Sequence, residues 1–384
     1  MPINKLIVKN YKSLKDFSLE LKPFMVFIGP NNAGKSNILD CMRFLSQLGR
    51  KGDEARRAVI ERGEFEQIVY DGDIGNTITI ELQGSLKNKG KIISYKYRIE
   101  LIGVRFGRLR IVKEVFSAKD LEKPLFEFPL EGNMAIVRDE TGKEISRLSV
   151  GDESLYLSYF DDINHYPILG KFSSEMQNWT FLNLLPPLMK GALPIKKELH
   201  LQTWGENLPI VLHALQSEYP DKFKEIEEIL KSAIPELKDL TTGLTSHEPG
   251  KTYIRIMEKN LKLSIPAWGM SDGSLRLLGL LAALYLPKPL PLICIEEPEN
   301  YVHPRLLELI VDLIKTASER TQIFVTTHSP YFVDLIQPED LFIVEKKEAQ
   351  TTVRKAKDKK GIKEALRTLG LGEMWYSGSL GGVP

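Results

Sequence analysis

The sequence predicts an α/β fold in which a mixed sheet forms the core, with an antiparallel β subdomain and a mainly helical insertion. Three observations lead to this prediction. An apolar, β-prone run at residues 24–28 leads into a glycine-rich loop and then into a helical pattern. Buried-type strands alternate with helical patterns from residue 275 onward, which is typical of a parallel sheet. Apolar and polar residues alternate between residues 77 and 115, which predicts an antiparallel meander.

The composition sets the limits for the class of protein. A chain of 384 residues suffices for one large domain or two moderate ones. Lys and Arg number 52 and Asp and Glu 51, so a nucleic-acid surface would have to be a local patch.

The most apolar window, residues 275–295, is broken by prolines and charges and is too interrupted to cross a bilayer. The N-terminus lacks the layout of a signal peptide. The only two cysteines, Cys41 and Cys294, lie in apolar segments and indicate a reducing compartment. We therefore expect a cytoplasmic protein.

The first part of the chain, residues 1–116, is expected to hold the glycine-rich loop and the meander. The expected strands, with Gly107 as a turn, are at residues 3–9, 17–21, 24–28, 68–70, 77–82, 92–101 and 103–115. A helical pattern at residues 37–45 follows the loop. These elements form the N-terminal part of the predicted domain.

Residues 117–250 differ in character and are interpreted as an insertion that carries partner or oligomer contacts. Two helical patterns stand out here, at residues 207–219 and 221–233. No heptad pattern is sustained, so no long coiled-coil arm is expected. The C-terminal part, residues 251–384, returns to an α/β pattern. Its expected elements are strands at 252–257, 261–265, 290–295, 322–326 and 341–344, helices at 275–285 and 304–318, and a basic helical patch at 354–367.

The glycine-rich loop has the spacing Gly29-x-x-x-x-Gly34-Lys35-Ser36 of a P-loop, between a strand and a helix. Glycines let backbone N–H groups approach phosphates, and the helix N-terminus adds a favourable field. Lys35 would neutralise the β- and γ-phosphates, and Ser36 would supply an oxygen to Mg²⁺. The loop therefore predicts that the protein binds a nucleoside triphosphate.

Two acidic residues, Glu296 and Glu297, follow the apolar strand of residues 292–295. The ends of strands are where α/β folds place ligand chemistry. Beside a P-loop, the first acid would anchor the water shell of Mg²⁺, and the second would orient or deprotonate the attacking water. His328 follows another buried strand, and either it contacts the γ-phosphate or it is a structural histidine.

Four segments occur in an order that resembles the ATPase heads of ABC type. They are residues 29–36, 271–276, 295–300 with His303-Pro304, and 327–330. The sequence is most similar to the RecF/SMC/OLD-like branch, in particular its short, stand-alone "AAA family" ATPases without a Toprim domain. Residues 8–14 and 372–382 resemble the termini of this branch. The resemblance implies an ABC-ATPase head that binds ATP and Mg²⁺ and hydrolyses ATP to ADP and phosphate.

The resemblance also implies roles for individual residues. Glu297 would be the catalytic glutamate, acting with Lys35, and His328 the switch histidine. Ser36 and Glu296, the Walker B acid, would hold the metal. Ser271 and Gly273 match the ABC signature loop, which in the family reaches the γ-phosphate of a dimer partner; alternatively they cap a helix. The full set expected to bind ATP is Gly29, Asn31, Asn32, Ala33, Gly34, Lys35, Ser36, Asn37, Lys12, Ser271 and Gly273.

Three functions are compatible with this sequence. The resemblance favours an ATP-dependent switch or clamp subunit of a DNA-maintenance or anti-phage complex, which acts as a homo-oligomer with a separate effector chain, such as a Toprim-like nuclease. The alternative is a self-sufficient SMC- or RecF-like ATPase that binds DNA, for which the basic runs 105–110 and 354–367 leave room. A transporter ATPase that docks a membrane permease is disfavoured by the string at residues 296–300. Asp71 and Asp73, like Asp161 and Asp162, are interpreted as turn and loop residues, so this chain is not expected to be a nuclease.

Overall fold

The structure of the protein is a computed structural model, which describes residues 2–51, 54–104, 107–119, 121–130, 134–149, 154–160, 162–246, 248–358 and 369–382. The chain divides into two compact units. Unit 1 comprises Met1–Pro23, Gly29–Trp179 and Phe342–Arg354, and unit 2 comprises Phe24–Ile28, Thr180–Leu341 and Lys355–Pro384. The expected insertion at residues 117–250 is thus shared between the units, and it contains strands as well as helices.

Unit 1 is built on an eight-stranded antiparallel sheet with the order β2-β1-β4-β5-β6-β7-β8-β9. Its strands are β1 (Ile3–Tyr11), β2 (Leu14–Glu20), β4 (Ile78–Asn88), β5 (Lys91–Val104), β6 (Arg108–Ala118), β7 (Phe126–Leu130), β8 (Met134–Arg138) and β9 (Glu144–Leu148). Its helices are α1 (Lys35–Leu48), α2 (Glu54–Ile60), α3 (Glu64–Ile68), α4 (Pro167–Gln177) and the 3₁₀ turns η1 (Tyr70–Gly72) and η3 (Tyr156–Tyr159). The neighbouring strands β17 (Leu341–Lys347) and β18 (Gln350–Lys355) belong to this unit through residues 342–354.

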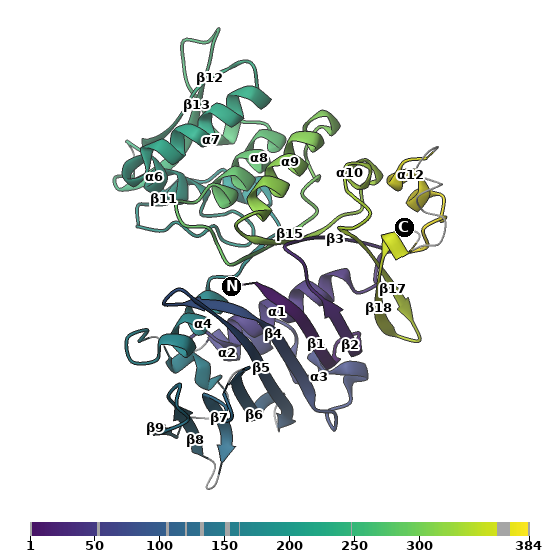
Figure 1. The fold of residues 1–384 in the computed structure, drawn as a ribbon. Helices are drawn as coiled ribbons and strands as arrows, with labels where there is room; N and C mark the ends of the chain where they lie inside the picture. The colour runs from purple at the N-terminus through teal and green to yellow at the C-terminus, as the bar shows by residue number, and fades with distance from the viewer. Residues whose placement is uncertain are drawn as a thin grey trace. The chain divides into compact units, whose positions relative to one another are not determined.

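The core of unit 1 forms where α1 covers one face of the sheet (Figure 1). The alternating burial along β1 directs its apolar residues to this face. There the ring of Tyr11 packs on Phe44 of α1 with the ring centroids 5.5 Å apart. The predicted meander is therefore present. The strand predicted at residues 68–70 is wrong, because Ile68 ends α3 and only Val69 forms an isolated bridge, to Tyr11.

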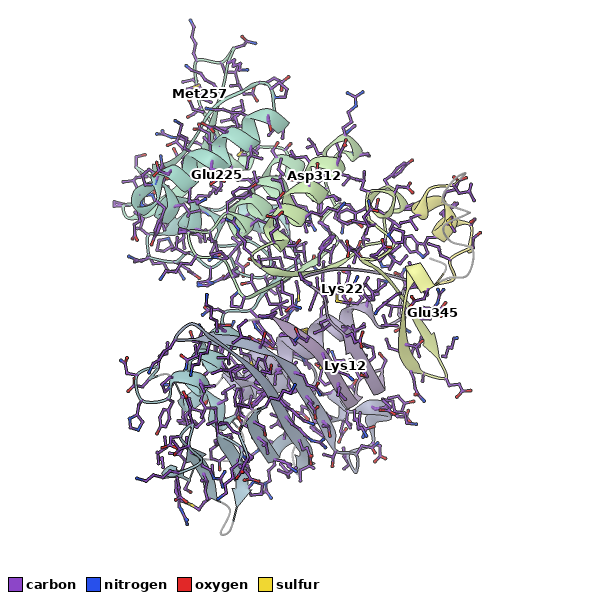
Figure 2. The ribbon with its side chains drawn as sticks, in the orientation of Figure 1. Lys12, Lys22, Glu225, Met257, Asp312 and Glu345 are labelled. Atoms are coloured by element: carbon purple, nitrogen blue, oxygen red, sulfur yellow. The ribbon has the colours of Figure 1, made fainter. Side chains whose placement is uncertain are left out.

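Unit 2 contains four parallel strands with the order β10-β15-β16-β3 and a smaller sheet in which β13 pairs with β11, β12 and β14. The parallel strands are β10 (Thr180–Leu182), β15 (Leu292–Glu296), β16 (Gln322–Thr326) and β3 (Phe24–Ile28), and the others are β11 (Leu193–Pro194), β12 (Leu237–Leu244), β13 (Lys251–Glu258) and β14 (Ile265–Pro266). The helices are α5 (Pro186–Met189), α6 (Leu208–Glu218), α7 (Pro220–Ala233), η4 (Ala267–Gly269), α8 (Asp272–Leu284), η5 (Pro304–Leu306), α9 (Leu307–Ser318), α10 (Pro330–Asp334), η6 (Ala356–Asp358) and α12 (Leu371–Tyr376). Side chains fill the spaces between the elements of each unit (Figure 2).

One prediction for the C-terminal part is corrected by the structure, and another falls largely on residues outside the described ranges. The strand predicted at residues 261–265 is wrong except at its last residue: Leu261 closes a turn on Glu258, and Leu263 is 81% exposed. Leu261 and Leu263 thus belong to a loop that leads into β14. The predicted basic helical patch begins as the end of β18, and residues 359–367 lie outside the described residues, as do Arg105 and Phe106 of the other basic run.

The register of the parallel strands determines where the candidate site lies in unit 2. Glu296 of β15 pairs with Thr326 of β16, and Thr326 pairs with Phe27 of β3. The N–H of Thr327 donates to the carbonyl oxygen of Phe27 at 3.2 Å. The strand that leads into the glycine-rich loop therefore ends at the same sheet edge as the strands followed by Glu297 and His328.

Candidate functional site

The glycine-rich loop begins directly after β3 and ends where α1 begins. Gly29 and Gly34 have φ angles of 153° and 103°, which L side chains rarely adopt. A Cβ on Gly29 would overlap the carbonyl oxygen of Val344, and a Cβ on Gly34 would overlap the hydroxyl of Thr351. The N-cap of α1 is Gly34, which has no side chain to accept from the first turn. The loop therefore ends at the N-terminus of a helix, where an anion is favoured.

Lys35 lies inside this loop, with only 6% of its surface exposed. Its Nζ donates to the carbonyl oxygens of Gly29 at 2.8 Å and Pro30 at 3.0 Å. A buried ammonium group needs such partners. The loop thus holds a buried cation at the N-terminus of α1, and the neighbouring Ser36 is exposed. Of the other predicted loop residues, Asn31 and Asn32 are exposed and Ala33 is buried.

A chain of hydrogen bonds supports the loop from the outside. Asn37 Nδ2 donates to Ser13 Oγ at 2.7 Å, and Ser13 Oγ lies 2.6 Å from Thr351 Oγ1. Thr351 Oγ1 donates to the carbonyl oxygen of Ala33 at 2.9 Å. The role of Thr351 could not be read from the sequence, because 338 residues separate it from Ser13 and no local pattern marks it.

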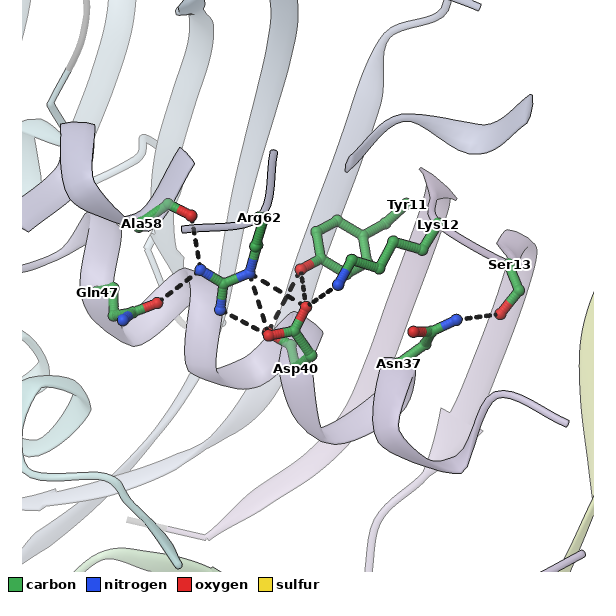
Figure 3. Close-up of polar contacts among 8 residues, drawn as sticks. All are labelled: Tyr11, Lys12, Ser13, Asn37, Asp40, Gln47, Ala58 and Arg62. Atoms are coloured by element: carbon green, nitrogen blue, oxygen red, sulfur yellow. Dashed lines mark hydrogen bonds and ion pairs between the residues drawn. The ribbon is translucent and has the colours of Figure 1, made fainter. Parts of the chain in front are cut away.

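Lys12, predicted to contact phosphate, pairs with Asp40 on α1 (Figure 3). The Asp40 carboxylate accepts from Lys12 Nζ at 2.6 Å, from the Tyr11 hydroxyl at 2.7 Å and from Arg62 Nη2 at 2.6 Å. Burial raises the pKa of Asp40, but the hydrogen bonds and charges of Arg62 and Lys12 outweigh this effect and lower the pKa to about 2. This cluster ties α1 to β1, and the phosphate contact of Lys12 stays a prediction.

A group of acidic residues lies in unit 2, at the end of β15. Glu297 has a left-handed φ of 49°, and its N–H donates to the carbonyl oxygen of Thr326 at 2.9 Å. Its Oε1 lies 3.5 Å from Nε2 of His328, and its Oε2 accepts from the His328 N–H at 3.2 Å. The structure therefore brings Glu297 and His328 together, with Glu296 next to them as the last residue of β15.

A third carboxylate, Glu299, orients the loop that carries the histidine. Its Oε1 accepts from Thr327 Oγ1 at 2.6 Å and from the His328 N–H at 3.0 Å. Its Oε2 is buried and has no hydrogen-bond partner in the described part of the chain. The string Glu296-Glu297-Pro298-Glu299 was noted in the sequence, but the sequence did not show which of its acids would contact the histidine loop.

Arg276 is a further residue whose role the sequence analysis missed. It is 1% exposed, and its guanidinium donates to the carbonyl oxygens of Leu184, of Glu297 and, at 3.1 Å, of Glu296. Burial lowers its pKa to about 10, against the opposing effect of the nearby Glu299, so it carries a charge at neutral pH. One signal was available in the sequence: Arg276 is the only charged residue in the apolar pattern at 275–285.

Ser271 and Gly273 lie at the start of α8. Ser271 is the N-cap, and its Oγ accepts from the Ser274 N–H at 3.2 Å, so the predicted helix cap is present. A Cβ on Gly273 would lie 2.8 Å from the carbonyl oxygen of Tyr301. The signature role of these two residues is compatible with this position, because Ser271 is exposed.

The aspartates considered as a nuclease site have structural roles where they are described. Asp73 Oδ1 accepts from the N–H of Gly75 at 3.0 Å, and Asp162 Oδ1 accepts from the N–H of Asn164 at 2.9 Å. Asp161 lies outside the described residues. Within the described ranges, no cluster of three His, Cys, Asp or Glu residues is arranged to hold a metal. No helix in these ranges is long and apolar enough to cross a membrane.

The loop, the strand-end acids and the fold define an ABC-type ATPase of the RecF/SMC/OLD kind. The head of an SMC protein bound to the C-winged helix domain of ScpA superposes with a TM-score of 0.58 and 15% identity, covering 92% of this chain and 98% of that one. The family model described as "AAA domain, putative AbiEii toxin, Type IV TA system" matches residues 24–334, so the chain belongs to this family.

Curated proteins with similar sequences include OLD nucleases, the Septu protein PtuA, the chromosome partition protein Smc and the DNA replication and repair protein RecF. An OLD nuclease of Thermus scotoductus is 24% identical over 367 residues, which cover 90% of this chain and 62% of that protein. The Septu protein PtuA of Bacillus mycoides is 23% identical over 378 residues, covering 94% and 43%. The Old nuclease of Escherichia phage P2 is 22% identical over 371 residues, covering 84% and 55%. The chain thus spans between about two fifths and three fifths of the length of these relatives.

Proposed function

We propose that this chain is the ATP-binding and ATP-hydrolysing switch subunit of a prokaryotic DNA-maintenance or anti-phage defence complex. It acts as an ATP-sandwich dimer or larger homo-oligomer, together with a separate effector chain. The pairing of Glu297 with His328 at the end of β15 carries this proposal, because a carboxylate held by a histidine at a strand end suits the activation of water.

The glycine-rich loop suits the triphosphate of ATP. Gly29 and Gly34 allow the left-handed backbone that shapes the loop and the close approach of Val344 and Thr351 to it, and Lys35 supplies a buried positive charge there. When a nucleotide binds, its phosphate oxygens replace the loop carbonyls as partners of Lys35. The Ser36 hydroxyl and the Glu296 carboxylate are oxygen ligands of the type that Mg²⁺ prefers.

Glu297 is proposed as the base that takes a proton from the attacking water. Bound Mg²⁺ would neutralise charge on the phosphates during this step. His328 holds the Glu297 carboxylate and would sense the loss of the γ-phosphate. Because ATP would join two protomers and its hydrolysis would release them, the reaction sets an association state, as in a switch.

The relatives support a role in defence or repair. The OLD nucleases and PtuA favour the defence complex, with a nuclease-like effector as the proposed partner. The Smc and RecF relatives support the alternative, a DNA-binding repair ATPase. The nearly equal numbers of basic and acidic residues disfavour that alternative.

The test compares wild type with Glu297→Gln, in Mg-ATP, for hydrolysis and for mass in solution. Glu297→Gln should keep ATP binding, lower kcat by about 10²–10⁴-fold and accumulate a closed dimer, because the base is lost while the phosphate contacts remain. The matched control is Glu308→Gln, an exposed glutamate on α9, which should behave as wild type. Hydrolysis by Glu297→Gln at the wild-type rate would contradict the assignment.

A second variant, Lys35→Ala, tests the nucleotide site itself. It should lose affinity for ATP, because the buried ammonium group that neutralises the phosphates is removed. Equilibrium binding of a fluorescent ATP analogue measures this loss. Wild-type affinity in Lys35→Ala would refute the phosphate-binding loop. Pull-down of Glu297→Gln from its host with Mg-ATP identifies the partner: a nuclease-like chain supports the switch subunit, and a mass increase that needs only added DNA supports the alternative.

A further inference from the structure

We propose that Arg276 is a positioning residue that connects the signature end of α8 to the backbone of Glu297. Through this connection, a contact made at Ser271 and Gly273 controls the catalytic acid of the same chain. The inference rests on the proposed ATP-sandwich function and deepens it, because it assigns the regulation of the site to one side chain.

The contacts of Arg276 link three segments of unit 2. The residue lies on the first turns of α8, three positions after Gly273. Its Nη2 donates to the carbonyl oxygens of both Glu296 and Glu297, and its Nη1 donates to that of Leu184, beyond the end of β10. A guanidinium group is planar and rigid, so its donors cannot move independently of one another. A shift of α8 must therefore move the backbone of Glu297 as well.

A second contact joins α8 to the turn that follows β15. Gly273 approaches the carbonyl oxygen of Tyr301 so closely that an added Cβ would lie 2.8 Å away. The ring of Tyr301 in turn lies 5.8 Å from the guanidinium carbon of Arg276. Tyr301 has a left-handed φ of 66°. The turn from Glu297 to Tyr301 is thus held against α8 at both of its ends.

The position of the Glu297 carboxylate depends on this backbone. Glu297 has a left-handed φ of 49°, a conformation that persists only where surrounding contacts impose it. The charged hydrogen bond from Arg276 to its carbonyl oxygen is one of these contacts, and such bonds are about twice as strong as neutral ones. Loss of the bond would let the carboxylate leave the position in which it meets His328.

The connection predicts communication between two sites. In an ATP-sandwich dimer, Ser271 and Gly273 of one chain face the nucleotide on the partner, whereas Glu297 serves the nucleotide on its own chain. Arg276 then transmits the occupancy of the partner's site to the base of its own site. Hydrolysis should therefore be positively cooperative in ATP, and Arg276 should be required for the cooperativity.

The experiment measures ATP affinity, kcat and the Hill coefficient for Arg276→Lys at a protein concentration at which mass measurements show the ATP-dependent dimer. A lysine keeps the positive charge but lacks the planar arrangement of N–H donors with which the guanidinium group reaches three carbonyl oxygens. We expect ATP affinity and dimer formation to be retained, kcat to fall about 10- to 100-fold, and the Hill coefficient to fall to one. The matched control is Arg320→Lys, because Arg320 donates to the carbonyl oxygen of Leu284 at the other end of α8 and lies 5.9 Å from the ring of Tyr285. This control should retain the wild-type kcat and Hill coefficient.

The outcomes separate this inference from the proposed function. If wild type neither dimerises with ATP nor hydrolyses it, the proposed function fails. If wild type does both cooperatively and Arg276→Lys does the same, the inference about Arg276 is overturned. Should Arg276→Lys not fold, Tyr301→Leu serves instead, because Tyr301 is 52% exposed. It should lower kcat and the Hill coefficient in the same direction, and unchanged values would overturn the inference.

Discussion

Replacement of Glu114 by glutamine tests how a buried carboxyl group makes the stability of unit 1 depend on pH. Glu114 on β6 is completely buried. Its Oε1 accepts from the Tyr97 hydroxyl at 2.9 Å and from the Leu157 N–H at 3.0 Å, and its Oε2 accepts from the Tyr156 N–H at 2.7 Å. Burial raises the pKa of Glu114 from 4.5 to about 7, against the opposing effect of these three donors.

The size and sign of the effect follow from linkage. Between pH 4.5 and 7 the folded protein keeps the proton on Glu114 while the unfolded chain has lost it, so the free energy of unfolding falls as the pH rises. At 1.36 kcal/mol per pH unit, the loss amounts to about 3 kcal/mol across this window. Glu114→Gln cannot titrate, and its amide group also faces the Tyr156 N–H, which costs about 1–3 kcal/mol. The difference in unfolding free energy between wild type and Glu114→Gln should therefore be large at pH 5, in favour of wild type, and smaller at pH 7.5.

The assay is urea unfolding of wild type and Glu114→Gln at pH 5, 6, 7 and 7.5, with the difference in unfolding free energy plotted against pH. Other titrating groups cancel in this difference. Tyr97→Phe serves as a second perturbation: it removes a donor that lowers the pKa of Glu114, so the pH window should extend upward. A difference between wild type and Glu114→Gln that is constant from pH 5 to 7.5 would refute the reasoning.

Two further substitutions test the supports of the glycine-rich loop. Asp40→Asn should lower the free energy of unfolding by about 3–5 kcal/mol near neutral pH, since it leaves the buried Arg62 charge unpaired, and urea titration checks this. Because the folded pKa of Asp40 is about 2, the wild-type advantage should shrink by about 2–3 kcal/mol as the pH falls from 4 through 2. Thr351→Val removes the hydroxyl that joins Ser13 to the carbonyl oxygen of Ala33; it should cost about 1–3 kcal/mol of stability and weaken ATP binding, and wild-type affinity for an ATP analogue would show that the loop needs no such support.

The sequence predicted those parts of the site that depend on local pattern. Local patterns predicted three elements. Continuous apolar runs predicted the strand at Phe24–Ile28 and the strand that ends at Glu296, and a helical spacing of apolar residues predicted the helix that begins at Lys35. The sequence placed Glu297 and His328 each after a buried strand; their contact follows from the parallel pairing of these two strands, which only the structure shows.

The parts that could not be predicted depend on long-range contacts. Thr351 reaches the loop only because the β18 strand lies next to Ser13 in the folded chain. Glu114 lies in a strand in which buried and exposed residues alternate, and a glutamate in such a pattern indicates an exposed position. It is buried because Tyr97 and the segment at Tyr156 pack against it. The strand predicted at residues 261–265 failed for the opposite reason, since an alternating pattern without a neighbouring strand leaves Leu263 in solvent.

The left-handed backbone of Glu297 has a consequence for how the protein can change over generations. At φ 49° a glycine would avoid a penalty of about 1–2 kcal/mol that a glutamate carries. Selection for heat tolerance alone would therefore favour glycine at this position, and the proposed base would be lost in the same step. Stability and the proposed turnover thus make opposite demands on this one residue.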